Sequence, residues 1–223
     1  VTVSIGTSGS AIEGTDYGTI SDITISSGDT TGTASFTPTD DNLYETSTDE
    51  TATVSITGVS GGSATESGSQ SVTLTIEENE SAPTVTLSTS ATSIDENSGS
   101  VLTLTATLSV ATTADVTVTI ATSGSATEGT DYTDGSGNID DLVITAGNTT
   151  ETISFKPTDD SVYEGDETAT ISIDSVSGGE ASENGTQAVT ITISENESAP
   201  TVTLSVSASS IAENSGSTLT ITA

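Results

Sequence analysis

The side chains of this chain that could bind a ligand or take part in catalysis are mainly carboxylates. There are 33 Asp and Glu residues against a single basic residue, Lys156, which gives a formal charge of −32. The chain has no His and no Cys, so the side chains that zinc and copper prefer are missing and oxygen atoms would have to hold any cation. Carboxylates in flexible loops suit Ca²⁺, which takes about six to eight oxygen ligands. The first chemistry to test against the sequence is therefore calcium binding.

Other chemistries fit the composition poorly. Ser and Thr are abundant, but a nucleophile needs a neighbouring base, and the chain offers no His and only one Lys. Paired carboxylates could cleave glycosidic bonds. Aromatic residues make up only 3% of the chain, however, too few to give each repeated loop an aromatic surface on which a sugar ring could stack. We expect a protein that is not an enzyme.

The charge also excludes two classes of partner. A net charge of −32 would repel nucleic acids and anionic lipid surfaces. No run of 18 apolar residues is present, so no segment is predicted to insert into a membrane. The partners expected instead are cations, neighbouring repeats or further copies of the chain.

The acids recur because the sequence repeats itself. The segment VTVSIGTSGSAIEGTDY returns as VTVTIATSGSATEGTDY, and PTDD, DETAT, ENESAPTVTLS and ENSGS each occur twice. The two ENESAPTVTLS segments start at Glu78 and Glu195, which are 117 residues apart. This spacing predicts three units: residues 1–82 as a repeat that lacks its first two strands, 83–199 as a complete repeat, and 200–223 as the first two strands of a third.

Alternation of apolar residues with Thr and Ser predicts strands throughout, with no helical period. In the complete repeat we expect seven of them, at 84–88, 101–108, 115–120, 139–145, 149–156, 167–174 and 187–193. The predicted inward side chains are Val85, Leu87, Leu102, Leu104, Val116, Val118, Ile120, Leu142, Ile144, Ile153, Phe155, Ile171, Ile173, Val189, Ile191 and Ile193. Seven short strands in a repeat of this length predict an all-β fold of tandem immunoglobulin-like Greek-key sandwiches.

These strands would gather the acids at one end. If successive strands alternate in direction, alternate loops share a pole of the sandwich, and 12 of the 19 acids in the complete repeat fall in the loops of a single pole. They are Asp95, Glu96, Glu128, Asp131, Asp134, Asp159, Asp160, Glu164, Asp166, Glu167, Glu195 and Glu197. A solvated acidic surface is the plain alternative. The clustering at one pole and its return in both copies favour a metal site, since so many like charges repel one another without a cation between them.

An ordered set of motifs resembles the Calx-β domain. The motifs are ENSG at 96–99, GTDY at 129–132, TDDSVYEGDE at 158–167, and a last strand that ends in acids at 195–197. The resemblance covers nearly the whole chain and implies an immunoglobulin-like sandwich that binds calcium. The family occurs in sodium–calcium exchangers, an integrin subunit and many large bacterial and marine surface proteins.

The resemblance also implies a set of calcium ligands. In the complete repeat these are Glu96, Asp131, Asp159, Asp160, Glu164 and Glu167, and in the first repeat Asp16, Asp40, Asp41, Glu45 and Glu50. The acids that end the last strand complete the set: Glu195 and Glu197, and before them Glu78 and Glu80. The exchanger domains carry three Asp at that place, whereas this chain has Glu-Asn-Glu, a departure that argues against tight binding of several ions.

These observations predict a non-enzymatic structural repeat of an extracellular, cell-surface adhesin, matrix or filament protein, made rigid by Ca²⁺ at the acidic pole between repeats. The alternative is an adhesion module that binds glycans or surface proteins through exposed loops or Thr-rich faces. The two incomplete ends suggest an array, for which two arrangements remain. Either the polypeptide continues in both directions, which we favour, or copies join head to tail by strand addition.

Overall fold

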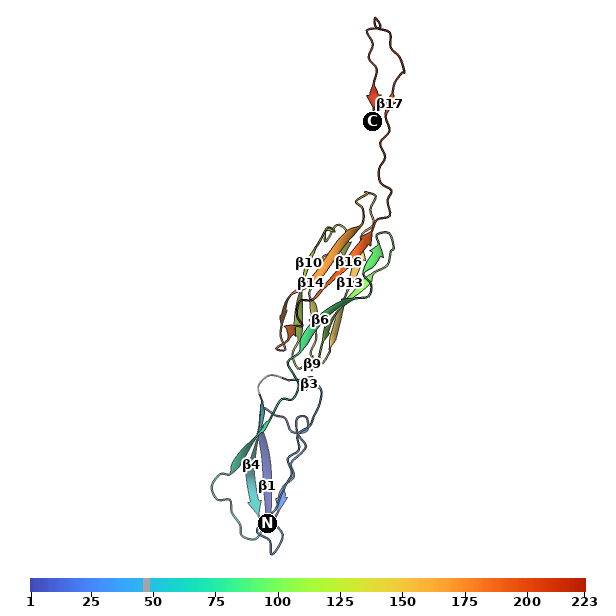
Figure 1. Ribbon diagram of the computed structural model, residues 1–223. Helices are drawn as coiled ribbons and strands as arrows, with labels where there is room; N and C mark the ends of the chain where they lie inside the picture. The colour runs from blue at the N-terminus through green and yellow to red at the C-terminus, as the bar shows by residue number, and fades with distance from the viewer. Residues whose placement is uncertain (46–48) are drawn as a thin grey trace.

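A computed structural model describes residues 1–45 and 49–223 of the chain, and within these residues all regular structure is β-strand. The molecule is elongated (Figure 1): the first repeat lies at the N-terminal end, the second forms the middle, and a hairpin extends beyond it. The described residues include no helix long and apolar enough to cross a membrane.

The second repeat is a two-sheet sandwich. One sheet has the order β12-β10-β14-β16-β7 and the other the order β11-β13-β8-β6-β15. The strands of the first sheet are β7 (Ser93–Asp95), β10 (Val116–Gly124), β12 (Leu142–Ile144), β14 (Glu167–Ser177) and β16 (Ala188–Ser194). Those of the second are β6 (Thr84–Thr89), β8 (Leu102–Leu108), β11 (Tyr132–Thr133), β13 (Thr150–Pro157) and β15 (Ser182–Glu183). All seven predicted strands are confirmed, and the fold is the immunoglobulin-like sandwich that the alternation predicted.

The core of the second repeat lies between these sheets. Thirteen of the sixteen predicted inward side chains are buried, and the other three, Ile120, Ile153 and Val189, are partly buried against the same cluster. Tyr132, which was not among the predicted inward side chains, is buried and stacks on Phe155 with ring centroids 4.7 Å apart. These two rings are the largest fully buried side chains of the second repeat, in a core that is otherwise aliphatic.

The first repeat is an open half of the same sandwich. Its sheet, in the order β2-β1-β4-β5, consists of β1 (Thr2–Gly9), β2 (Ile23–Thr24), β4 (Glu50–Ser60) and β5 (Ser71–Ile76). Residues 31–37, which match β13 of the second repeat, belong to no strand. In the second repeat β13 pairs with β8, and residues 1–80 contain no counterpart of β8, so the backbone at 31–37 lacks the partner that would define a strand.

Two acids in each repeat stabilise the backbone. β10 bulges between Thr119 and Ile120, and the N–H of Ile120 donates to Asp141 Oδ1 at 3.0 Å. Glu128 accepts from the N–H of Ile139 and the hydroxyl of Thr122. The first repeat has the same bonds through Asp22 and Glu13. These carboxylates satisfy donors that the bulge and the turns leave without a strand partner.

A short pair of strands joins the two repeats. β3 (Leu43–Tyr44) runs parallel to β9 (Ala111–Thr112) of the second repeat. Tyr44 is buried and its hydroxyl donates to Glu180, while the Thr113 hydroxyl donates to the carbonyl of Glu45 at 3.0 Å. The connection between the repeats is therefore a packed contact with its own hydrogen bonds, in addition to the covalent link.

The C-terminal segment forms a hairpin that packs on neither repeat. β17 (Ser205–Val206) pairs with β18 (Ile221–Thr222), and all residues from 200 to 223 are exposed. Figure 1 shows this hairpin at the end of the molecule opposite the N-terminus.

Candidate metal centres

Among residues 1–45 and 49–223, three groups of carboxylates lie at the predicted pole of the two repeats. In each group one oxygen of every member lies within 4.8 Å of the others. The groups are Asp16, Glu45 and Glu50 in the first repeat, and Glu96, Glu195 and Glu197 with Asp131, Glu164 and Glu167 in the second. All nine residues belong to the set that the family resemblance named.

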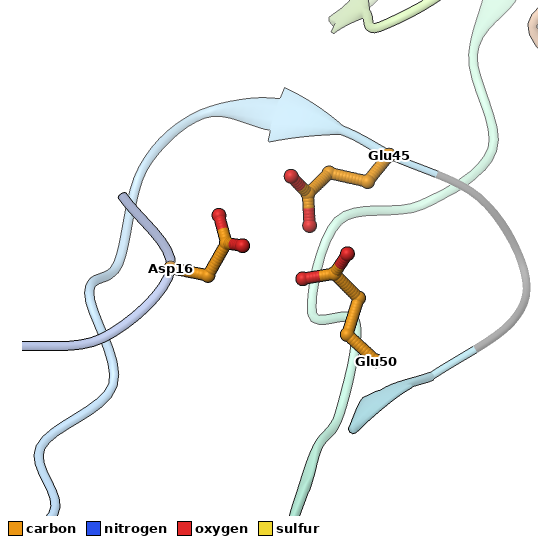
Figure 2. Close-up of side chains that lie close together, drawn as sticks. All are labelled: Asp16, Glu45 and Glu50. Carbon is orange, nitrogen blue, oxygen red and sulfur yellow. The ribbon is translucent and has the colours of Figure 1, made fainter. Parts of the chain in front are cut away.

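The first-repeat group, which we call the junction cluster, is formed by three segments far apart in sequence. Figure 2 shows the side chains of Asp16, Glu45 and Glu50 directed toward one another. Asp16 is held in its turn because its carboxylate accepts from the N–H of Ile12. Glu45 directly follows β3, and Glu50 begins β4. The sandwich topology thus brings the loop after β1 and the loop before β4 to one point.

The second-repeat group of Asp131, Glu164 and Glu167 has the same construction. Asp131 accepts from the N–H of Thr127 at 2.6 Å, as Asp16 does in the first repeat, and Glu167 begins β14 as Glu50 begins β4. Glu96 lines a hollow with this group, so in the second repeat the two clusters adjoin. The two repeats differ in loop length, yet each places one Asp and two Glu carboxylates in the same arrangement.

Glu195 holds the loop that carries these ligands. Its Oε2 accepts from the N–H groups of Glu164 and Gly165 at 2.6 and 2.9 Å, and its Oε1 accepts from the N–H of Glu197. In the first repeat Glu78 accepts from the N–H of Glu45 at 2.8 Å and from that of Glu80. The long Glu side chain that departs from the exchanger pattern thus serves to fix the acidic loop through its backbone.

Hydrogen bonds and crowding separate the pKa values of these carboxyls. The N–H groups of Glu197 and Glu164 lower the pKa of Glu195 to about 2. The Glu195 carboxylate, with burial, raises the pKa of Glu197 to about 7, because a proton on Glu197 would be shared with Glu195. Burial and then the charge of Asp16 raise the pKa of both Glu45 and Glu50.

Two of the carboxylate oxygens lack any partner although they are buried. Among the described residues, Oε2 of Glu50 and Oε2 of Glu197 are the buried side-chain oxygens that accept no hydrogen bond. A buried carboxylate oxygen without a partner carries a large desolvation cost. Glu50 supplies one such oxygen in the junction cluster, and Glu197 supplies one in the group of Glu96, Glu195 and Glu197. Carboxylate oxygens of this kind are the ligands that a hard cation requires.

The raised pKa of Glu197 predicts a pH dependence. An acid whose pKa is raised from 4.5 to about 7 by folding binds protons more tightly in the folded state, so its contribution to stability is present below pH 4.5 and is lost as the pH rises through 7. With EDTA present, we expect the melting temperature of the second repeat to fall between pH 5 and pH 8. With saturating Ca²⁺ the fall should shrink, because the cation takes the place of the proton. Thermal melts at both pH values test this, and equal pH dependence with and without Ca²⁺ would contradict it.

Six of the residues predicted as ligands lie outside the three groups. They are Asp40, Asp41, Glu78, Glu80, Asp159 and Asp160. Asp160 and Asp41 each accept from the N–H two residues later, of Val162 and Leu43 respectively, which shapes the loop. Glu128, also predicted among the pole acids, accepts a hydrogen bond from the backbone N–H of Ile139. The contact of Tyr44 with the second repeat was not predicted, because its only signal in the sequence is an aromatic residue beside an acid.

The fold and the acidic pole define this chain as a tandem array of immunoglobulin-like β-sandwiches with carboxylate clusters at one pole. The model of the Calx-beta domain family matches residues 1–80 and 78–197. The chain belongs to the Calx-beta domain family and contains two tandem repeats of it. A search of curated proteins found no match.

Several solved structures are similar to this chain. The apo form of the Calx CBD1 domain is 19% identical with a TM-score of 0.41, covering 52% of this chain and 99% of that one. The Calx CBD2 domain is 16% identical with a TM-score of 0.38, covering 49% and 85%. The surface layer protein SbsC, domains 1–6, is 16% identical with a TM-score of 0.31, covering 82% of this chain and 20% of that one.

Proposed function

We propose that this chain is a non-enzymatic structural module of an extracellular surface, matrix or filament protein, in which Ca²⁺ stiffens the connection between successive sandwiches. The observation that carries the proposal is the position of the junction cluster. Asp16, Glu45 and Glu50 converge within 4.8 Å, and the residue next to Glu45 in sequence, Tyr44, is buried in the contact with the second repeat.

Glu45 would couple the ion to the contact between repeats. Its side chain belongs to the junction cluster, its N–H donates to Glu78, and its carbonyl accepts from the Thr113 hydroxyl of the second repeat. A cation held by the Glu45 carboxylate would therefore fix the backbone that pairs with β9. Without a cation, the repulsion among the three carboxylates acts on the same short segment.

The proposed location outside the cell rests on the supply of the cation. Millimolar Ca²⁺ outside cells can saturate weak oxygen-ligand sites. An adhesive role, in which exposed loops or Thr-rich faces bind glycans or surface proteins, is the second candidate, favoured by the rows of Thr that pair across β14 and β16.

Calcium is expected to raise the stability of the chain and to make the connection between its repeats more rigid. A ligand bound only by the folded state adds about 2.7 kcal/mol at a hundredfold excess over its Kd. Melting should be compared in millimolar CaCl₂, in EDTA, and in NaCl of matched ionic strength, with small-angle X-ray scattering of the same samples. We expect a higher melting temperature and a narrower distribution of inter-repeat distances in CaCl₂. An equal effect of NaCl would mean that screening alone stabilises the chain.

A further inference from the structure

Asn184 is the one asparagine, of the eight in this chain, that precedes a glycine. Asparagine is chemically labile, since its side-chain amide can react with the backbone nitrogen of the next residue when that nitrogen is free and its approach is not crowded. Glycine crowds the approach least because it has no Cβ. Asn184 and Gly185 are both exposed in the loop between β15 and β16, and a Cβ added to Gly185 would meet no atom within 4 Å beyond its chain neighbours. The loop therefore leaves room for this reaction at Asn184.

At most of the other asparagines the nitrogen that would attack is already engaged in a hydrogen bond. In six of the eight cases the N–H that follows the Asn is a donor: those of Leu43, Glu80, Ser98, Ile139, Glu197 and Ser215. Such a nitrogen must give up its acceptor before it can attack, which slows the reaction. Within residues 1–45 and 49–223, no acceptor is found for the N–H of Gly185 or for that of Thr149, which follows Asn148.

Asn148 is restrained in two other ways. Its Nδ2 donates to the hydroxyl of Thr145 at 2.8 Å, and the next residue, Thr149, is β-branched and crowds the approach. Asn184 has neither restraint, because its neighbour is glycine and its side chain has no hydrogen bond to any residue that the structure describes. An exposed side chain, a free nitrogen and a following glycine therefore coincide at Asn184 alone among the eight.

We propose that Asn184 is a site of spontaneous deamidation, and that the reaction loosens the loop between β15 and β16 from β6. The nitrogen of Gly185 bonds to Cγ of Asn184 as the bond from Cγ to Nδ2 breaks, and the proton of the Gly185 N–H leaves with Nδ2 as ammonia. Water then opens the cyclic imide at one of its two carbonyl carbons. Its hydroxyl forms a carboxylate at that carbon, and its other proton restores the amide N–H. Opening at one carbon gives Asp, and opening at the other gives isoaspartate.

The loop at Asn184 holds the first strand of the second repeat. The N–H groups of Ser182 and Asn184 donate to backbone carbonyls at the start of β6, at 3.1 and 2.9 Å. Glu180, in the same loop, accepts from the Tyr44 hydroxyl of the first repeat. In isoaspartate the main chain runs through the former side chain and gains a carbon atom, so the donors on this loop no longer match the spacing of the carbonyls of β6. The reaction would therefore act beside the contact between the repeats.

The first repeat shows that the turn needs the glycine but not the asparagine. Ser67 is the counterpart of Asn184, and Gly68 has φ +74° where Gly185 has φ +68°. The carbonyl of Ser67 accepts from Gln70 Nε2, as the carbonyl of Asn184 accepts from the Gln at the same position of the second repeat. Asn184→Ser is therefore a control that keeps the turn and removes the reaction.

Incubation of the 223-residue chain in EDTA at pH 6 and at pH 8 tests the site, and it is independent of the proposed calcium function. We expect ammonia release that is faster at pH 8, where the attacking nitrogen loses its proton more readily, and isoaspartate at position 184 in peptide maps. Each other Asn should give at least about tenfold less product, the effect of a hydrogen bond and a side chain on the rate. Asn184→Ser should release ammonia correspondingly more slowly.

The same chain unfolded in urea separates structure from local sequence. Folding should slow the reaction less at Asn184 than at Asn97 and Asn214, because the N–H groups after the latter two are donors only in the folded chain. Product at Asn97 or Asn214 as fast as at Asn184 in the folded chain would overturn the proposed site. Equal slowing by folding at all three would also overturn it.

Hydrogen exchange tests the loosening of the loop. In the aged, isoaspartyl chain the N–H of Ser182 should exchange at least about tenfold faster than in fresh protein, because its bond to β6 is weakened. Asn184→Asp adds the charge without the extra carbon atom and should exchange as fresh protein does. Unchanged exchange on ageing would overturn the loosening. Equally fast exchange in fresh Asn184→Asp would assign the effect to charge and contradict the lengthened main chain as its cause.

Discussion

The variant Phe155→Ala is expected to destabilise the second repeat by about 3–5 kcal/mol, the cost of removing a fully buried aromatic side chain. Phe155 has no exposed surface and stacks on Tyr132, its centroid 4.7 Å away. The stacked pair bridges from β13 to the segment that carries Asp131. Loss of the ring would therefore open a cavity beneath the acidic pole and between the two sheets.

Phe36→Ala is the matched control for this prediction. Phe36 stacks on Tyr17 at 4.8 Å, in the same way, but it is only partly buried because no strand covers it. Urea unfolding of both variants, followed by circular dichroism, should show a smaller loss for Phe36→Ala. Equal losses would contradict the role given to burial of the ring, since Phe155 is fully buried and Phe36 is only partly buried.

The double variant Asp131→Asn with Glu167→Gln is expected to weaken the stabilisation of the second repeat by Ca²⁺. Both residues belong to one carboxylate group. Burial and then the charge of Asp131 raise the pKa of Glu167, so the natural chain has unfavourable repulsion at this point when no cation is bound. The variant should be at least as stable as the natural chain in EDTA, yet lose at least about tenfold in Ca²⁺ affinity, or about 1.4 kcal/mol.

The control for this variant is Asp174→Asn with Glu151→Gln, which removes the same charge away from the pole. Isothermal titration and melting with and without CaCl₂ compare the two double variants. If Ca²⁺ acts through the net charge of the whole protein, both double variants will lose the same small part of their stabilisation by CaCl₂. If Ca²⁺ binds at the group of Asp131, Glu164 and Glu167, only Asp131→Asn with Glu167→Gln will lose its stabilisation. An undiminished response in Asp131→Asn with Glu167→Gln would remove this group from the set of ligands.

Much of the fold follows from local sequence. Alternation with a period of two requires that side chains such as Val116 and Val118 share one face of a strand, and both are buried. The sequence repeats at a spacing of 117 residues. Two segments with the same pattern are expected to fold alike. For the same reason the sequence predicted that the acidic loops would meet at one pole, and residues of all those loops do meet there.

Only the tertiary structure decided which acids face one another. Glu128 and Asp131 lie three residues apart in one loop, yet the first accepts from the backbone N–H of Ile139 while the second joins Glu164 and Glu167. No local pattern separates them, because the direction of a carboxylate in a loop depends on which N–H groups the rest of the fold leaves without a partner.

The contact between repeats and the exposed state of the hairpin were likewise decided in three dimensions. Tyr44 has no periodic pattern around it, and its burial depends on β9, 67 residues away. Leu204 has the pattern of a core residue and yet lies in water. Alternation determines which side of a strand is apolar, whereas burial requires a second surface opposite that side, and the sequence of the strand alone does not determine whether one is present.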